Sequence, residues 1–119
     1  MAPAWWNAAI TGPSDRRALA HIDRFNAAQR SGDWAAFVTG FTDDAVMSFV
    51  GVPAGPFVGR AAIEAAYRAQ PPTDTMRATS VASDGDTDVV RFAWTGGGTG
   101  TMTLRWRGDV VAALEVAFD

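Results

Sequence analysis

The stretch "GTMTLRWRGDVVAALEVAF", residues 100–118, carries the clearest structural pattern in the chain. Side chains of a β-strand point alternately to opposite faces. Before the Gly108–Asp109 pair, large apolar residues alternate with Thr and Arg, and after it they alternate with Ala and Glu. The large apolar residues are Met102, Leu104 and Trp106, then Leu114, Val116 and Phe118. The stretch therefore predicts two strands that share one large apolar face.

A third strand with the same pattern precedes them. In "VVRFAWT", residues 89–95, the side chains of Val90, Phe92 and Trp94 share one face. Between these strands, "GGGTG" (96–100) predicts a flexible hairpin turn. The apolar face is either ordinary core beneath helices or the wall of a pocket, because small-molecule pockets are also apolar and aromatic. Periodicity leaves both alternatives open.

The first half of the chain predicts helices. Apolar residues recur at helical spacing from the N-cap Ser14 to Arg30, and Gly32 ends this helix. A short second helix, "WAAFVTGF" (34–41), follows the cap Asp33.

A third helix, "RAAIEAAYRAQ" (60–70), begins after Gly59 and ends at Pro71–Pro72. Residues 45–50 and 77–83 predict two further strands. This order predicts an α+β fold in which three N-terminal helices pack on one face of a strongly bent antiparallel sheet.

Length and composition set the organisation and exclude several functions. With 119 residues, we expect one domain at 14–119 and an N-terminal arm at 1–13, whose Trp5 and Trp6 either dock on the domain or extend into solvent. The net charge is −3, and the basic residues are scattered, so we expect neither nucleic acid nor a membrane as partner.

The numbers of Cys and His residues exclude several kinds of catalytic and metal site. There is no Cys, which excludes disulfides and thiolate chemistry, and His21 is the single His, which excludes a His-rich metal site. We expect no metal and no cofactor. The first residues have no basic start or long apolar run, so we expect a cytoplasmic protein.

The segments "RSGDWAAFVTGFTDDAVMSFVG" (30–51) and "FVGRAAIEAAYRA" (57–69) resemble the nuclear-transport-factor-2-like superfamily. The resemblance rests on Gly32–Asp33, the aromatic residue before Asp43–Asp44–Ala45, Gly59–Arg60 and the closing "ALEVAFD". It covers nearly the whole chain after residue 15. It implies a cone-shaped α+β fold shared by ketosteroid isomerases, polyketide cyclases and non-catalytic binding domains.

Ketosteroid isomerases use an Asp base and an oxyanion hole made of a Tyr and a protonated Asp. The resemblance places these three polar roles at Phe49, Phe25 and Met102, which are all apolar. Of the supporting tyrosines, Tyr67 alone is retained. We therefore predict that the chain is not a ketosteroid isomerase of the known mechanism. Asp43 and Asp44 are predicted to be structural, as short Asp side chains that bond backbone donors where a helix turns into a strand.

Three residues are candidates for catalysis, each with a structural alternative. Tyr67 lies on the inward side of its helix and is either a ligand-binding group or a core Tyr with one hydrogen bond. His21 is either a base or a residue at the edge of the core. Asp88 is in phase with Val90, so it is either an inward carboxylate with acid–base function or the end of a turn.

Two functions follow from these observations. In the first, an apolar pocket holds a hydrophobic small molecule that is polyketide-, terpenoid- or steroid-like, with isomerase- or cyclase-like activity. Its predicted wall is Phe25, Phe49, Val90, Phe92, Trp94, Met102, Trp106 and Phe118. In the second, the interior is fully packed and the protein is a non-catalytic domain. Both functions allow a homodimer through the outer sheet face. A cavity above ~300 Å³ would favour the first.

Overall fold

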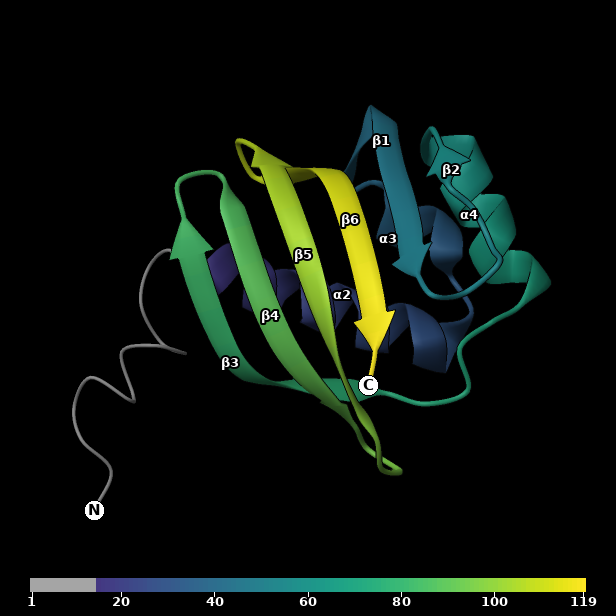
Figure 1. The fold of residues 1–119 in the computed structure, drawn as a ribbon. Helices are drawn as coiled ribbons and strands as arrows, with labels where there is room; N and C mark the ends of the chain where they lie inside the picture. The colour runs from purple at the N-terminus through teal and green to yellow at the C-terminus, as the bar shows by residue number, and fades with distance from the viewer. Residues whose placement is uncertain (1–14) are drawn as a thin grey trace, which may run out of the picture.

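The structure, a computed structural model, describes residues 15–119. The predicted arm at 1–13 and the predicted cap Ser14 lie outside this range. The helices of the described chain are α2 (Arg16–Ser31), α3 (Trp34–Val38) and α4 (Arg60–Ala69). The strands are β1 (Phe41–Val50), β2 (Phe57–Val58), β3 (Met76–Asp84), β4 (Thr87–Trp94), β5 (Thr99–Arg107) and β6 (Val110–Phe118). All three helices lie on one side of a curved, open sheet, which confirms the α+β prediction (Figure 1).

The sheet differs from the prediction in one strand pair. Its order is β2-β1-β6-β5-β4-β3, and every neighbouring pair is antiparallel except β1 and β6. The predicted antiparallel sheet is therefore a mixed sheet. A hairpin forces its two strands to run antiparallel, but β1 and β6 are joined through α4 and four other strands. This long connection lets β6 run parallel to β1.

The end of α2 and the starts of α3 and α4 lie where the sequence predicts them. Gly32 has φ 77°, a conformation in which a Cβ would be strained, and its N–H donates to the Ala28 carbonyl at the end of α2. The Asp33 carboxylate accepts a 3.1 Å bond from the N–H of Ala36 and caps α3. α4 begins directly after Gly59 and ends before the two prolines.

Asp43 and Asp44 lie within β1 rather than in a turn, because α3 is shorter than predicted and the strand begins at Phe41. Asp43 pairs with Arg60 at 3.0 Å, and Asp44 pairs with Arg107 at 3.4 Å. The Thr42 hydroxyl also donates to Asp44, and this bond is the main cause of the lowered pKa of Asp44. Both carboxylates are exposed. Their partners are side chains and not the backbone donors of a turn, and their structural role stays a prediction.

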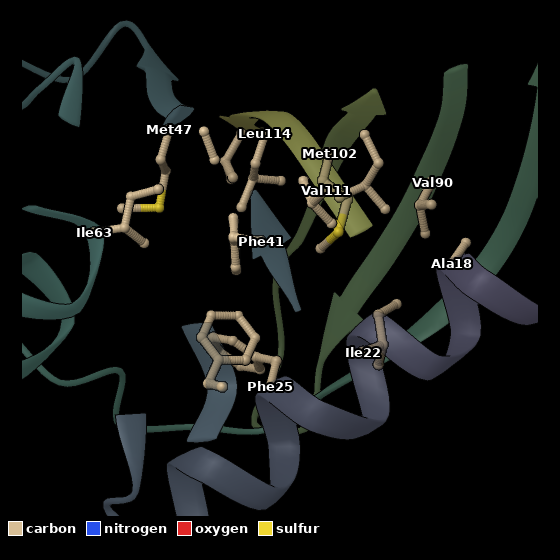
Figure 2. Close-up of a cluster of buried hydrophobic side chains, with 14 of the residues drawn as sticks. Ala18, Ile22, Phe25, Phe41, Met47, Ile63, Val90, Met102, Val111 and Leu114 are labelled. Atoms are coloured by element: carbon tan, nitrogen blue, oxygen red, sulfur yellow. The ribbon is translucent and has the colours of Figure 1, made fainter. Parts of the chain in front are cut away.

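The apolar face of the sheet forms the core. Met102, Leu104 and Trp106 are buried, whereas Arg105 and Arg107 on the opposite face are exposed. Figure 2 shows the side chains that α2 directs toward this face, which are Ala18, Ile22 and Phe25. Each large apolar side chain buried here contributes about 1.5–3 kcal/mol. The core is completed by Phe41, Met47 and Val111 from β1 and β6.

Candidate functional site

A cavity of about 660 Å³ lies between the sheet, α2 and α4. Small-molecule sites typically measure about 300–1,000 Å³. The inner part of its wall consists of buried residues, among them Phe25, Met47, Phe92 and Leu114. The outer part consists of half-buried or exposed residues from three loops, at 52–54, 70–74 and 96–97. The cavity is therefore closed at the core and open at these loops.

Six of the eight residues predicted to bind a ligand lie on this wall. They are Phe25, Phe49, Phe92, Trp94, Met102 and Phe118. The other two, Val90 and Trp106, are buried but do not line the cavity. They share the inner sheet face, but β4 and β5 continue beyond the cavity, and there this face packs as core. The apolar face is therefore the wall of the cavity in one part of the sheet and ordinary core in the other.

Asp88 faces inward as its phase indicates, but it does not reach the cavity. It is fully buried, and its Oδ2 accepts a 2.9 Å bond from the indole N–H of Trp106 and a 3.2 Å bond from Nε of Arg17. The Arg17 guanidinium also lies 5.3 Å from the centre of the Trp106 ring. Asp88 thus joins the start of α2 to the sheet. Asp88 does not line the cavity, and its acid–base role stays a prediction.

The ring of Tyr67 lies in the aromatic layer beneath the cavity. It stacks on Trp34 with centroids 4.5 Å apart and planes at 7°. Burial raises the pKa of Tyr67, so its hydroxyl stays protonated. No hydrogen bond within residues 15–119 includes this hydroxyl, and it is not among their fully enclosed polar atoms that lack a partner. The hydroxyl therefore faces the open space of the cavity.

His21 lies on the same wall and is buried. Its ring centroid is 5.4 Å from that of Phe37 and 5.8 Å from that of Phe41. Burial, together with the nearby charge of Arg24, lowers the pKa of His21 to about 3. Like the Tyr67 hydroxyl, its ring nitrogens have no partner within the described range and are not fully enclosed. The imidazole is thus a neutral polar group at the closed end of an apolar cavity.

Several wall residues were not predicted from the sequence. Leu114 and Val116 come from a strand whose inner face the alternation already indicated, whereas Met47 and Phe57 come from β1 and β2, whose inner faces it did not identify. The loop residues, such as Pro71 and Asp74, follow no period that would identify them.

The Asp74 carboxylate is fixed at the cavity opening. It accepts a 2.7 Å bond from the N–H of Gly96 and a 2.8 Å bond from the N–H of Thr75. These bonds join the loop at 70–74 to the β4–β5 turn, so the two loops form one edge of the opening.

The Asn26 side chain joins α2 to β3. Its amide donates 2.7 Å to the Met76 carbonyl and accepts 2.9 Å from the Met76 N–H. Both ends of the side-chain amide are therefore occupied in holding α2 against β3.

Residues 15–119 contain no group of three or more His, Cys, Asp or Glu side chains placed to hold a metal ion. None of their helices is long and apolar enough to cross a membrane.

Comparison with known structures shows what fold surrounds the cavity. An NTF-2-like protein of unknown function from Burkholderia xenovorans aligns with a TM-score of 0.69 at 15% identity, over 91% of this chain and 87% of its own. A SnoaL-like protein of unknown function from Burkholderia thailandensis aligns with a TM-score of 0.70 at 15% identity, over 87% and 95%. A hypothetical protein with a ketosteroid isomerase-like fold from Catenulispora acidiphila, in complex with trimethylamine, aligns with a TM-score of 0.68 at 17% identity, over 83% and 85%.

At these identities the structural matches show the fold alone. No curated protein sequence matches the chain significantly. The family is shown by the sequence itself, because residues 22–117 match the model of the SnoaL-like domain. That range includes the inner sheet face except Phe118, and most of α2. The chain therefore belongs to the SnoaL-like domain family.

Proposed function

We propose that the chain binds a hydrophobic small molecule in the 660 Å³ cavity. The observation that carries this proposal is that the cavity is lined largely by aromatic and aliphatic side chains, while the Tyr67 hydroxyl and the His21 imidazole face it without partners. Both groups are open to the cavity, and a ligand that excludes water from it would leave them unpaired unless one of its polar atoms bonds to one or both of them. The rest of the ligand would displace water from the apolar wall.

The activity that this site supports best is isomerase- or cyclase-like, on a polyketide-, terpenoid- or steroid-like substrate. This proposal is supported by the enclosed shape of the cavity and by its apolar wall, which carries few polar groups. An enclosed apolar site accelerates a reaction by holding the substrate in a reactive conformation. The Tyr67 hydroxyl would donate a hydrogen bond to an oxygen that gains negative charge. His21, with its pKa of about 3, would contribute as a neutral polar group, because an effective general base has a pKa near the working pH.

The binding proposal is tested by filling the cavity. Ala66 lines the cavity on α4, and the neighbouring Ala65 is exposed on the same helix. Steroid, terpenoid and polyketide probes are titrated into the protein while tryptophan fluorescence is recorded, since Trp94 lies on the wall. We expect saturable binding that Ala66→Phe abolishes and Ala65→Phe leaves intact. No response from any probe, or equal binding by both variants, would contradict the proposal.

A homodimer through the outer sheet face is a second proposal. No helix of the described chain covers this face (Figure 1). Its exposed apolar side chains include Val50, Val58 and Val89. A second copy of the chain would remove them from water. This association is compatible with ligand binding, because the cavity opens on the other side of the sheet.

A further inference from the structure

Gly100 lies inside strand β5 and not in the hairpin turn that "GGGTG" predicts. In that turn, Gly97 and Gly98 have positive φ angles, which favour glycine. Gly100 has no such angle. A glycine within a strand weakens the strand and marks places where another group comes close to the backbone. The reason for glycine at position 100 is therefore to be found in its surroundings.

Gly100 is flanked by two aromatic residues. It pairs with Phe92 on β4 and with Phe118 on β6, so the three residues form one row on the inner face. A Cβ added to Gly100 would lie 2.5 Å from Cζ and 2.8 Å from Cε1 of Phe92. Both distances are too short for carbon atoms. The Phe92 ring thus occupies the space above Gly100 and lies across the sheet.

The position of this ring determines the shape of the cavity. Phe92, Met102 and Phe118 all line it, and Phe92 is fully buried. A side chain at position 100 would displace the ring. Backbone lies beneath the ring, and the Trp94 ring stands beside it at 5.4 Å with an interplanar angle of 84°. The remaining direction for the ring is into the cavity.

We infer that Gly100 is a specificity-determining residue, because it lets Phe92 lie against the sheet and thereby sets the largest ligand that the cavity accepts. The inference rests on the proposed function, since a size limit has meaning only if the cavity binds a ligand. The inference adds to the proposed function that a strand residue, Gly100, sets this size limit from beneath the cavity wall. Gly100 itself contacts no ligand in this arrangement and acts through Phe92.

Two substitutions test the inference in opposite directions. Gly100→Ala would push the ring into the cavity and lower the size limit, whereas Phe92→Leu would remove the ring and raise it. The new methyl of Gly100→Ala would also lie 2.8 Å from the Ala117 carbonyl oxygen, which strains the β5–β6 pairing. Phe92→Leu leaves Gly100 unchanged and tests the size limit without that strain. Thr103→Ala, on the outer face of the same strand, is the matched control.

The probes are saturated ring alcohols with one to four fused rings, from cyclohexanol through 2-decalol to 3-androstanol, titrated by calorimetry. For the largest alcohol that the wild type binds, we expect Gly100→Ala to lose about tenfold or more in affinity, as a poor fit in an apolar pocket does. For cyclohexanol the loss should stay within about twofold. Phe92→Leu should accept the next larger alcohol, and Thr103→Ala should match the wild type.

The opposite results are equally specific. If both variants keep the wild-type size limit, or lose affinity equally for every alcohol, the inference is overturned. In that case Phe92 covers a strand glycine only to stabilise the sheet. If the wild type binds none of the alcohols and none of the probes named above, the proposed function itself is overturned, together with the size limit. The two failures are thus distinguished by the wild-type titration.

Discussion

The indole N–H of Trp106 donates a 2.9 Å hydrogen bond to the Asp88 carboxylate, and both residues are buried. The same carboxylate oxygen pairs with Arg17. Residues of one sheet face are thereby bonded to each other and to the first turn of α2. These bonds lie outside the cavity, so we expect them to affect the stability of the fold and not the affinity for a ligand.

Asp88→Ala should therefore destabilise the protein without changing its ligand affinity. The substitution leaves the Trp106 N–H without a partner and Arg17 without its counter-charge, and removing one member of a buried ion pair costs about 3–5 kcal/mol. We expect about 3 kcal/mol, because the Arg17 side chain is 23% exposed and can turn to water. Urea denaturation measures the change. Asp109→Ala, in the exposed β5–β6 turn, is the control and should change little.

His21 should make the fold sensitive to acid. Its pKa is about 3 in the folded protein and 6.5 in the unfolded chain, so between these values the unfolded chain binds a proton that the folded protein does not. The free energy of unfolding should thus fall as the pH drops from 6.5 toward 3, by up to about 1.4 kcal/mol per pH unit. Above pH 6.5 the effect is absent.

The measurement is urea denaturation of the wild type and of His21→Leu across this pH range. The carboxylates with lowered pKa values, Asp44 and Asp119, affect both proteins equally and cancel in the difference. The difference between the two unfolding free energies should change with pH below 6.5. Parallel curves would show that the His21 imidazole is not kept neutral by burial.

Tyr67→Phe should separate binding from stability. The hydroxyl has no partner in residues 15–119, so its removal should change the free energy of unfolding by less than about 0.5 kcal/mol, while the stacking on Trp34 is kept. Affinity for 2-decalol should fall by about 0.5–1.5 kcal/mol, the usual contribution of one hydrogen bond. Affinity for the hydrocarbon decalin should not change. A large loss of stability would instead place the hydroxyl in the core network.

The outer sheet face should control association. Val89→Asp places a charge on this face at a position that is already 38% exposed, so the monomer should remain folded. We expect sedimentation at micromolar concentration to show a dimer for the wild type and a monomer for the variant. A wild type that sediments as a monomer would rule out the dimer.

The sequence predicted those features that depend on local pattern. Alternation identified the inner face of β4, β5 and β6, and glycines and caps identified the helix ends. The parallel pairing of β1 with β6 was not predictable in this way, because it joins residues about 70 positions apart. The phase of Asp88 was right, but its partners Arg17 and Trp106 come from other elements. Gly100 was assigned to a turn because its neighbours in sequence are glycines, while its actual constraint comes from Phe92.

The position of β6 has a consequence for how the chain is made. β6 lies inside the sheet, between β1 and β5, although it is the last of the described strands in sequence order. During synthesis β1 emerges early and has only the two-residue β2 as a neighbour. Its other edge stays unpaired until residues 110–118 have left the ribosome. A nascent chain stalled before that point should therefore bind chaperones, and release of the final strand should end that binding.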